Sequence, residues 1–138
     1  MLVYSQNTYL LPIFNREIEV RAGYGVYSDN SSLAVVLMCR EADIDEDLLD
    51  DEDYVYDESA FDEIIATITV NLESSINLPV GEQYIDVNNY PLIASWLIEN
   101  NLATPSGGAD TGGHILYPAY KFQIPSDYTE RLESSRGE

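Results

Sequence analysis

The sequence predicts one α+β domain: an antiparallel β-sheet of about five strands, packed by one main helix, with an acidic insertion between two strands. Segments rich in β-branched and aromatic residues recur between turn residues, as strands require. A single segment, about 91–101, repeats its apolar side chains at helical spacing. The 138 residues are 45% hydrophobic, enough for one core. We therefore expect the domain to span 1–125, followed by a polar tail, 126–138.

The first strands are predicted in the N-terminal 40 residues. Residues 8–14 (TYLLPIF) are rich in strand formers, and Pro12 places that strand at an edge or an end. Residues 16–22 (REIEVRA) alternate charged and apolar side chains, which indicates a half-buried strand. Residues 23–32, with two glycines and the run SDNSS, supply turn chemistry. The apolar run at 33–39 (LAVVLMC) then suits a central strand.

Later strands follow a long acidic segment. Residues 64–72 alternate Ile, Thr and Val more regularly than any other part of the chain. We expect this strand to pair with 33–39 as a long hairpin, with 41–63 as the connection between them. A connection of this length is usually functional or disordered. Residues 84–87 predict a short strand, and residues 115–124 predict the last one.

The helix is predicted over 91–101. Asn88 or Asn89 can cap it, and Pro91 suits its first turn. Its apolar stripe, which we assign to the core, consists of Leu92, Ile93, Trp96 and Leu97. The glycine-rich tract 104–113 (TPSGGADTGG) reads as a flexible loop.

The most informative functional feature is the acidic segment, residues 41–63. Thirteen of its 23 residues are Asp or Glu and none is Lys or Arg, in a chain of net charge −19. This charge argues against direct binding to nucleic acid or to an anionic membrane surface, so the expected partner surface is basic. DNA presents roughly one charge per 1.7 Å, and proteins that bind it line their clefts with Lys and Arg. A dense row of carboxylates can occupy such a cleft.

Aromatic residues are interleaved with these carboxylates. The rings of Tyr54, Tyr56 and Phe61 can stack on arginines of a partner, and paired carboxylates can accept bidentate hydrogen bonds. The predicted partner-binding residues are Asp45, Glu46, Asp47, Asp50, Asp51, Glu52, Asp53, Tyr54, Tyr56, Asp57, Glu58, Asp62 and Glu63. A solvated or disordered acidic loop is the alternative interpretation.

Calcium binding is the other alternative for the segment. An EF-hand loop needs a glycine at its sixth position and a glutamate at its twelfth. Counting from Asp43 puts Leu48 and Tyr54 there, and counting from Glu41 puts Glu46 at the sixth position. Both registers lack the glycine, so we expect weak adventitious divalent binding and no dedicated metal or cofactor.

Few other residues suggest chemistry. His114 is the single histidine, and no spacing pairs it with a nucleophile. Asp110 begins a D-T-G triplet, but SGGA precedes it where aspartic proteases have an apolar strand. Cys39, the single cysteine, excludes an intramolecular disulfide and is expected to be buried. With no basic leader and no long apolar run, the expected location is the cytoplasm.

The last half of the chain carries a resemblance. The strings TITVNL, YIDVNNYP, ENNLATPSG and ILYPAYKF fall within residues 67–122. Together they resemble a family of unknown function that bacterial phages and conjugative elements encode. Asn101 stands where that family tends to have glycine, and GHI at 113–115 replaces a Ser-Gly-Phe-like triplet. The resemblance implies a mobile-element origin and carries no catalytic motif.

These observations predict a non-enzymatic inhibitor of a host defence nuclease. It would act as a DNA mimic on a basic nucleic-acid-binding protein, a Cas nuclease or a restriction enzyme, and most concretely as an anti-CRISPR protein against a Cas9-type effector. The alternative is a structural or regulatory interaction module, such as a homodimer joined through a sheet edge. A hydrolase built on Asp110 or His114 is the third class.

Overall fold

The computed structural model describes residues 3–13, 15–40, 43, 52 and 60–125. Its strands are β1 (Val3–Tyr4), β2 (Tyr9–Ile13), β3 (Arg16–Val26), β4 (Leu33–Cys39), β5 (Glu63–Thr67), β6 (Thr69–Val70), β7 (Glu82–Ile85), β8 (Ala103–Gly112) and β9 (Ile115–Phe122). Its helices are the 3-10 helix η2 (Glu73–Asn77) and the α-helix α2 (Ile93–Glu99).

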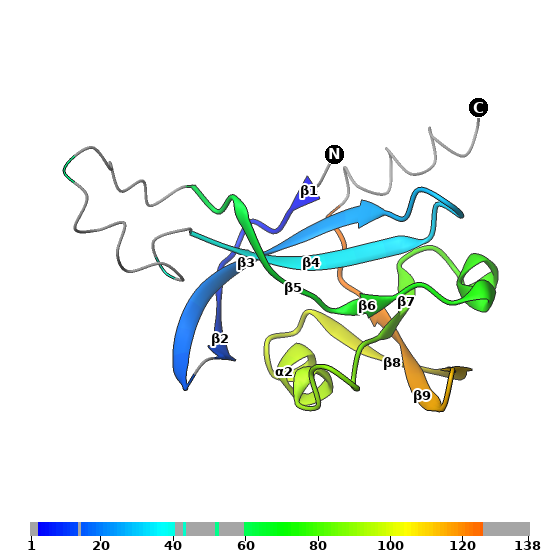
Figure 1. Cartoon of the computed structure of the whole chain (residues 1–138). Coiled ribbons are helices and arrows are strands. Elements are labelled where there is room, and N and C mark those ends of the chain that lie inside the picture. Colours follow the sequence, from blue (N-terminus) through cyan, green and yellow to red (C-terminus); the bar gives the residue numbers. More distant parts are fainter. Residues whose placement is uncertain (1–2, 14, 41–42, 44–51, 53–59, 126–138) are drawn as a thin grey trace.

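Within the described residues the strands form two antiparallel sheets, not the single sheet expected (Figure 1). The first has the order β1-β3-β4-β5, with β2 also paired to β3, and the second has the order β6-β7-β9-β8. The predominance of antiparallel strands beside one α-helix agrees with the predicted α+β class. The insertion itself falls mostly outside the described residues.

The predicted turn at 23–32 begins later than expected. Gly23 and Gly25 lie inside β3, because they pair with Val36 and Ala34 of β4 in a buried part of the sheet. The turn is instead closed by hydrogen bonds between Tyr27 and the Ser31–Ser32 backbone, and Ser31 has a left-handed φ of 59°. Pairing with a neighbouring strand thus overrides the local preference of glycine for turns.

One chain segment joins the two sheets. β5 pairs with β4, which confirms the predicted hairpin partners, and β6 follows after Ile68. The Ile68 N–H donates to the Val35 carbonyl on one side, whereas its carbonyl accepts from the Asp86 N–H on the other. The chain therefore kinks at Ile68 and exchanges β4 for β7 as its partner. β5 is left as an edge of the first sheet.

The glycine-rich tract predicted as a loop is a strand, so that prediction is wrong. β8 pairs with β9 over almost its whole length, with a register shift between Pro105 and Ala109. Gly107, at φ 95°, lies within that irregularity. Gly112 allows a close approach, because a Cβ there would lie 2.9 Å from Leu72 Cδ2. The sequence does not predict this strand, because its residues have low strand propensity and it is stabilised by pairing with β9.

The α-helix is shorter than the predicted 91–101. Ile93, Trp96 and Leu97 are buried as expected, but Leu92 is 75% exposed and lies outside the core. The Trp96 indole N–H donates to the Leu10 carbonyl at 2.7 Å, which ties the helix to β2. The helix ends in a Schellman-type turn, in which the Leu102 N–H reaches the Leu97 carbonyl at 2.9 Å. Asn101 takes the left-handed position of that turn, with φ 55°.

A buried glutamine connects the sheets near the start of β4. Gln83, fully buried on β7, donates through Nε2 to the Leu33 carbonyl at 2.8 Å and to Ser32 Oγ at 3.2 Å. Its Oε1 accepts from Ser75 Oγ at 2.8 Å and from the Tyr84 N–H at 2.9 Å. Every polar atom of this side chain is therefore satisfied, as burial requires.

Candidate functional site

Arginines attach the two ends of the acidic segment to the first sheet. We call this point of attachment the root; it consists of Arg16, Arg21, Arg40, Asp43 and Phe61. β4 ends at Cys39, and β5 begins two residues after Phe61. Two guanidinium groups lie over the Phe61 ring, with Arg40 Cζ 4.6 Å and Arg21 Cζ 5.0 Å from its centroid. These distances fit cation–π contacts. The ring is 6% exposed and clusters with Val36 and Met38 on the face of β4 away from the main core.

Phe61 is therefore not available to a partner's arginine, which corrects the expectation from the sequence. Its ring faces are used by arginines of the same chain. Burial against Val36 and Met38 makes it part of the fold. Together, the Phe61 ring and the side chains of Val36 and Met38 fix the point at which the acidic segment rejoins the sheet.

The start of the segment is held in the same way. Arg40 Nη1 donates to Asp43 Oδ2 at 3.0 Å, and Arg40 Nη2 pairs with Glu19 Oε1. Arg16 donates to the Asp43 carbonyl. Hydrogen bonds from Arg40 first, and then from Thr8, lower the pKa of Glu19. We name Arg16, Arg21 and Arg40 the arginine anchor.

The position of the arginines in the sequence points to this anchor, although the net charge does not. Three of the six Lys and Arg residues lie within the 25 residues before the acidic segment. Arginines that precede a block of carboxylates are suited to bind its ends, because the guanidinium fork pairs with carboxylates and stacks on rings.

The described salt bridges of the anchor lie at the root. In the described part of the chain, the carboxylates in salt bridges are Glu19 and Asp43. Between Asp43 and Phe61 the sequence carries nine further carboxylates and no Lys or Arg. The carboxylates of the segment therefore outnumber the three arginines of the anchor.

Three of the predicted partner-binding residues fall within the described structure. Glu52 and Asp62 are exposed, and Glu63 is half-buried on β5 opposite Cys39. The others lie outside the described residues: Asp45, Glu46, Asp47, Asp50, Asp51, Asp53, Tyr54, Tyr56, Asp57 and Glu58.

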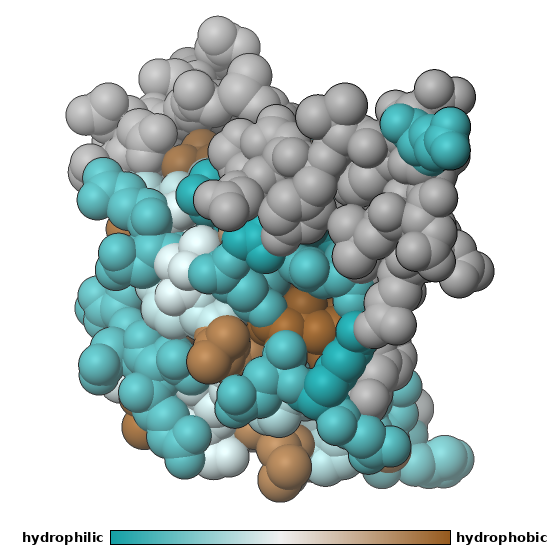
Figure 2. Space-filling model, turned by 90° about the vertical axis from the view of Figure 1, so that its left-hand side faces the viewer, coloured by the Kyte–Doolittle hydropathy of each residue, from teal (hydrophilic) through white to brown (hydrophobic). Residues whose placement is uncertain are grey.

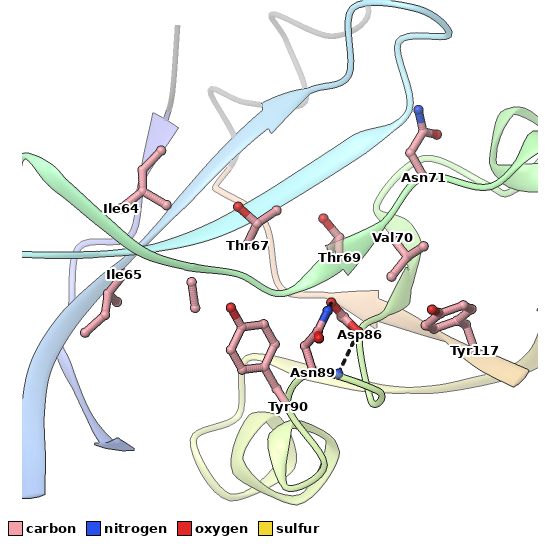
Figure 3. Close-up of a pocket in the computed structure, with 11 residues that line it drawn as sticks. Ile64, Ile65, Thr67, Thr69, Val70, Asn71, Asp86, Asn89, Tyr90 and Tyr117 are labelled. Atoms are coloured by element: carbon pink, nitrogen blue, oxygen red, sulfur yellow. Dashed lines mark hydrogen bonds between the residues drawn. The ribbon is translucent and has the colours of Figure 1, made fainter. Parts of the chain in front are cut away.

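Beside β5 the surface opens into a groove of about 680 Å³. One side is formed by the consecutive residues 64–67, and Asp86, Asn89 and Tyr90 lie across from them (Figure 3). Both carboxylate oxygens of Asp86 accept from Asn89, from its N–H at 3.1 Å and from its Nδ2 at 2.8 Å. These bonds fix the loop that leads into α2 and shape the far side of the groove.

An apolar pocket of about 250 Å³ adjoins this groove. The two share Ala66, Asn89 and Tyr90. The pocket lies between β2, β5 and the start of α2, and its apolar lining includes Leu11, Ile13, Leu37, Ile68, Ile93 and Trp96. On the face in Figure 2, apolar side chains likewise appear in a hollow and as isolated spots among hydrophilic residues.

Asp110, His114 and Cys39 lie apart from the acidic segment's predicted partner-binding residues in the sequence, and each has a different environment. Asp110 lies on β8, where it accepts from Ser74 Oγ and from the Thr111 N–H, and these hydrogen bonds lower its pKa. Ser74 Oγ also lies 2.8 Å from the Tyr84 hydroxyl. His114 is exposed in the turn between β8 and β9. Burial raises the pKa of the Cys39 thiol to about 11, so this thiol stays protonated at neutral pH.

Among the residues that the structure describes, no group of three or more His, Cys, Asp or Glu side chains is placed to hold a metal ion. In that same part of the chain, no helix has the length and apolar character needed to cross a membrane.

Comparison with known proteins gives one match. No curated protein and no solved structure matches the chain. The model of a family described as a domain of unknown function, DUF4313, matches residues 49–135, more than half of the sequence. That range begins within the acidic segment and includes β5 through β9. The chain therefore belongs to the DUF4313 family.

Proposed function

We propose that this protein is a non-enzymatic acidic binding protein that occupies the basic, nucleic-acid-binding cleft of a partner protein. The observation that carries the proposal is the arginine anchor. It ties both ends of the acidic segment to the first sheet through Asp43 and Phe61. The segment is thus attached at a defined place on a folded domain, unlike an acidic tail.

Electrostatics supply the reason for binding. A partner cleft rich in Lys and Arg gains charge-assisted hydrogen bonds from the carboxylates, and the long-range field speeds association. The protein's net charge of −19 favours any basic surface, so selectivity depends on how the carboxylates are spaced. Affinity should fall steeply as salt screens these charges.

In its most specific form, the proposal is an inhibitor of a host defence nuclease encoded on a mobile genetic element. The resemblance of residues 67–122 to proteins of phages and conjugative elements supports that origin. A Cas9-type effector is the best target, because it holds its PAM duplex and its heteroduplex in channels lined by Arg and Lys. Such an inhibitor would act in the bacterial cytoplasm, where its target works.

The test is competition for DNA by a guide-loaded Cas9-type nuclease, measured by electrophoretic mobility at two salt concentrations. The wild-type protein should displace target DNA at low salt and lose most of this effect at high salt. The test variant carries six changes to Asn or Gln, at Asp50, Asp51, Glu52, Asp53, Asp57 and Glu58, and should not compete.

A matched control variant separates the effect of where the carboxylates lie from the effect of the total charge. It also carries six changes to Gln, at Glu17, Glu73, Glu82, Glu99, Glu133 and Glu138, so its net charge equals that of the test variant. The control should still compete. Full competition by the test variant, or equal loss in both variants, would show that the acidic segment is not the binding surface. If the wild type does not displace DNA from this nuclease, the Cas9-type target is wrong.

A second candidate function is a regulatory interaction module in which the acidic segment is only a solvated loop. The edge of β5, which pairs with no other described strand on its outer side, favours it, since an unpaired edge can join another chain. A homodimer formed in this way would appear as twice the monomer mass in light scattering.

A further inference from the structure

We infer that the groove beside β5 is a second binding site, which takes an extended basic peptide segment of a partner protein as an additional β-strand. The inference concerns main-chain pairing at a sheet edge and an adjoining apolar pocket. It stands apart from the acidic segment and from the proposed DNA mimicry, and it places a partner's peptide on the β5 edge that the homodimer alternative would use for a second copy.

The β5 edge is the least protected of the edges of the described sheets. Natural edges are usually protected by shortness, proline or bulges. β1 and β6 have only two residues each, β2 contains Pro12, and β8 contains Pro105 beside a register shift. β5 has five residues and no proline, and Ile64 on it is 55% exposed. Its pairing with β4 shifts register between Ala66 and Ile64, so the regular part of this edge is at Ala66 and Thr67.

The pairing register shows which backbone groups of β5 point outward, where an added strand could pair with them. Ile68 donates to the Val35 carbonyl at 3.0 Å, so this pair is hydrogen-bonded. In an antiparallel ladder the next pair, Val36 and Thr67, is then not hydrogen-bonded. The N–H and C=O of Thr67 therefore point away from β4, and Thr67 lines the groove. An added strand would pair with these groups.

The groove also indicates the chemistry of its occupant. Its lining contains no Lys or Arg, and its carboxylate, Asp86, is buried and bonded to Asn89. The accessible negative charge comes from Asp62, which is exposed, and Glu63, which is half-buried, at the start of β5. A segment with basic side chains complements these charges. A second copy of this chain is disfavoured, because each copy carries a net charge of −19.

The adjoining apolar pocket adds a specificity element. It opens next to Ala66 and Tyr90, which also line the groove. In strand addition, main-chain hydrogen bonds give affinity, and pockets for alternate side chains give selectivity. A large apolar side chain of the added strand would enter between Ile13 and Trp96.

The probe is a peptide of about ten residues, the length of a long strand, in which Arg alternates with Val and one central Val is replaced by Phe. Binding is measured by fluorescence anisotropy and by amide chemical shifts. The peptide should bind and shift the amide signals of residues 63–67. Methylation of alternate peptide nitrogens should weaken binding about tenfold or more, which is 1.4 kcal/mol per factor of ten. Replacement of Phe by Gly should also weaken it.

Paired variants test the location. Thr67→Lys places a positive charge at the β5 edge and should weaken binding about tenfold. Thr104→Lys makes the same change at the exposed edge of β8 and should leave binding unchanged. The variant with six neutralised carboxylates in the acidic segment should still bind, so this inference can fail or survive independently of the proposed function.

Several results would overturn the inference. These are the absence of binding, equal binding of the methylated peptide, or shifts confined to residues outside 63–67. Loss of binding in the six-position variant with retention in Thr67→Lys would place the peptide on the acidic segment. A dimer that Thr67→Lys dissociates would identify a second copy as the occupant.

Discussion

The two ends of β4 are held by opposite kinds of chemistry. At its start, next to Leu33, the contacts are uncharged: the amide of Gln83 bridges Leu33, Ser32 and Ser75 inside the protein. At its end, after Cys39, Arg40 pairs with Glu19 and Asp43 and lies over the Phe61 ring. The first end binds the two sheets together, and the second end receives the acidic segment.

The contacts that stabilise the fold and the contacts that hold the charged segment thus lie at opposite ends of β4. A fully satisfied buried amide strengthens the core at every salt concentration, since screening hardly reaches it. Ion pairs at a partly exposed root add little stability and respond to salt and pH. We therefore expect mutations at the start of β4 to unfold the protein, and mutations at its end to alter the root of the acidic segment.

The largest effect is expected from Gln83→Leu. The change leaves the Leu33 carbonyl, Ser75 Oγ and the Tyr84 N–H with unmet hydrogen bonds in a buried site. The free energy of unfolding should fall by about 3 kcal/mol, measured by urea denaturation. Gln123→Leu, at an exposed position, is the control and should change it by less than about 0.5 kcal/mol. Equal effects would remove the distinction between the two ends.

The next largest effect is expected at the contact between the Phe61 ring and its two arginines. Phe61→Leu keeps an apolar side chain against Val36 and Met38 but removes both cation–π contacts. The expected loss is about 1.5 kcal/mol in the same assay. A double-mutant cycle with Arg21→Met should give a coupling of about 0.5–1 kcal/mol. Additive single effects would mean that the guanidinium group over the ring contributes nothing specific.

The pH dependence of stability tests the contact between Arg40 and Glu19. The pKa of Glu19 is lowered in the folded protein, chiefly by its hydrogen bond from Arg40. The resulting stabilisation is present above the pKa of Glu19 in the unfolded chain, and it disappears as pH falls through the folded value. In Arg40→Met, the loss of stability between neutral and acidic pH should be smaller than in the wild type. Lys121→Met, at an exposed position, should keep the wild-type pH profile.

The smallest effect is expected far from both ends of β4. Asn101 holds a left-handed conformation, with φ 55°, at the end of α2. Glycine adopts this conformation without strain, so Asn101→Gly should change the unfolding free energy by only a few tenths of a kcal/mol. Asn101→Ala should lower it by about 1 kcal/mol. Thermal melts of both variants would compare the two, and an unaffected Asn101→Ala would show that the turn carries no strain.

Strands with strong side-chain patterns could be read from the sequence. Residues 33–39 match β4 residue for residue, because an apolar run bounded by turn residues and charge has few other solutions. β2, β9 and the partner of β4 were also located. The buried stripe of the helix was found apart from Leu92, which precedes the first turn and faces solvent.

Elements that depend on distant pairing were missed. The glycine-rich strand β8 has few strand-forming side chains and exists through its ladder with β9. The kink at Ile68 divides one predicted strand between two sheets, because β7 replaces β4 as its partner there. Neither the anchor's contact with Phe61 nor the groove beside β5 has a local sequence signature, since their residues come from segments far apart in the chain.

The net charge, the concentration of carboxylates in 41–63 and the mainly antiparallel β character can all be predicted from the amino-acid sequence, because they follow from composition and short-range periodicity. That Arg16, Arg21 and Arg40 hold the root of that segment, and that β5 is an edge among the described strands, is seen only in the folded protein. Both depend on which strands become neighbours, and a chain selects its neighbours by burying the whole core at once.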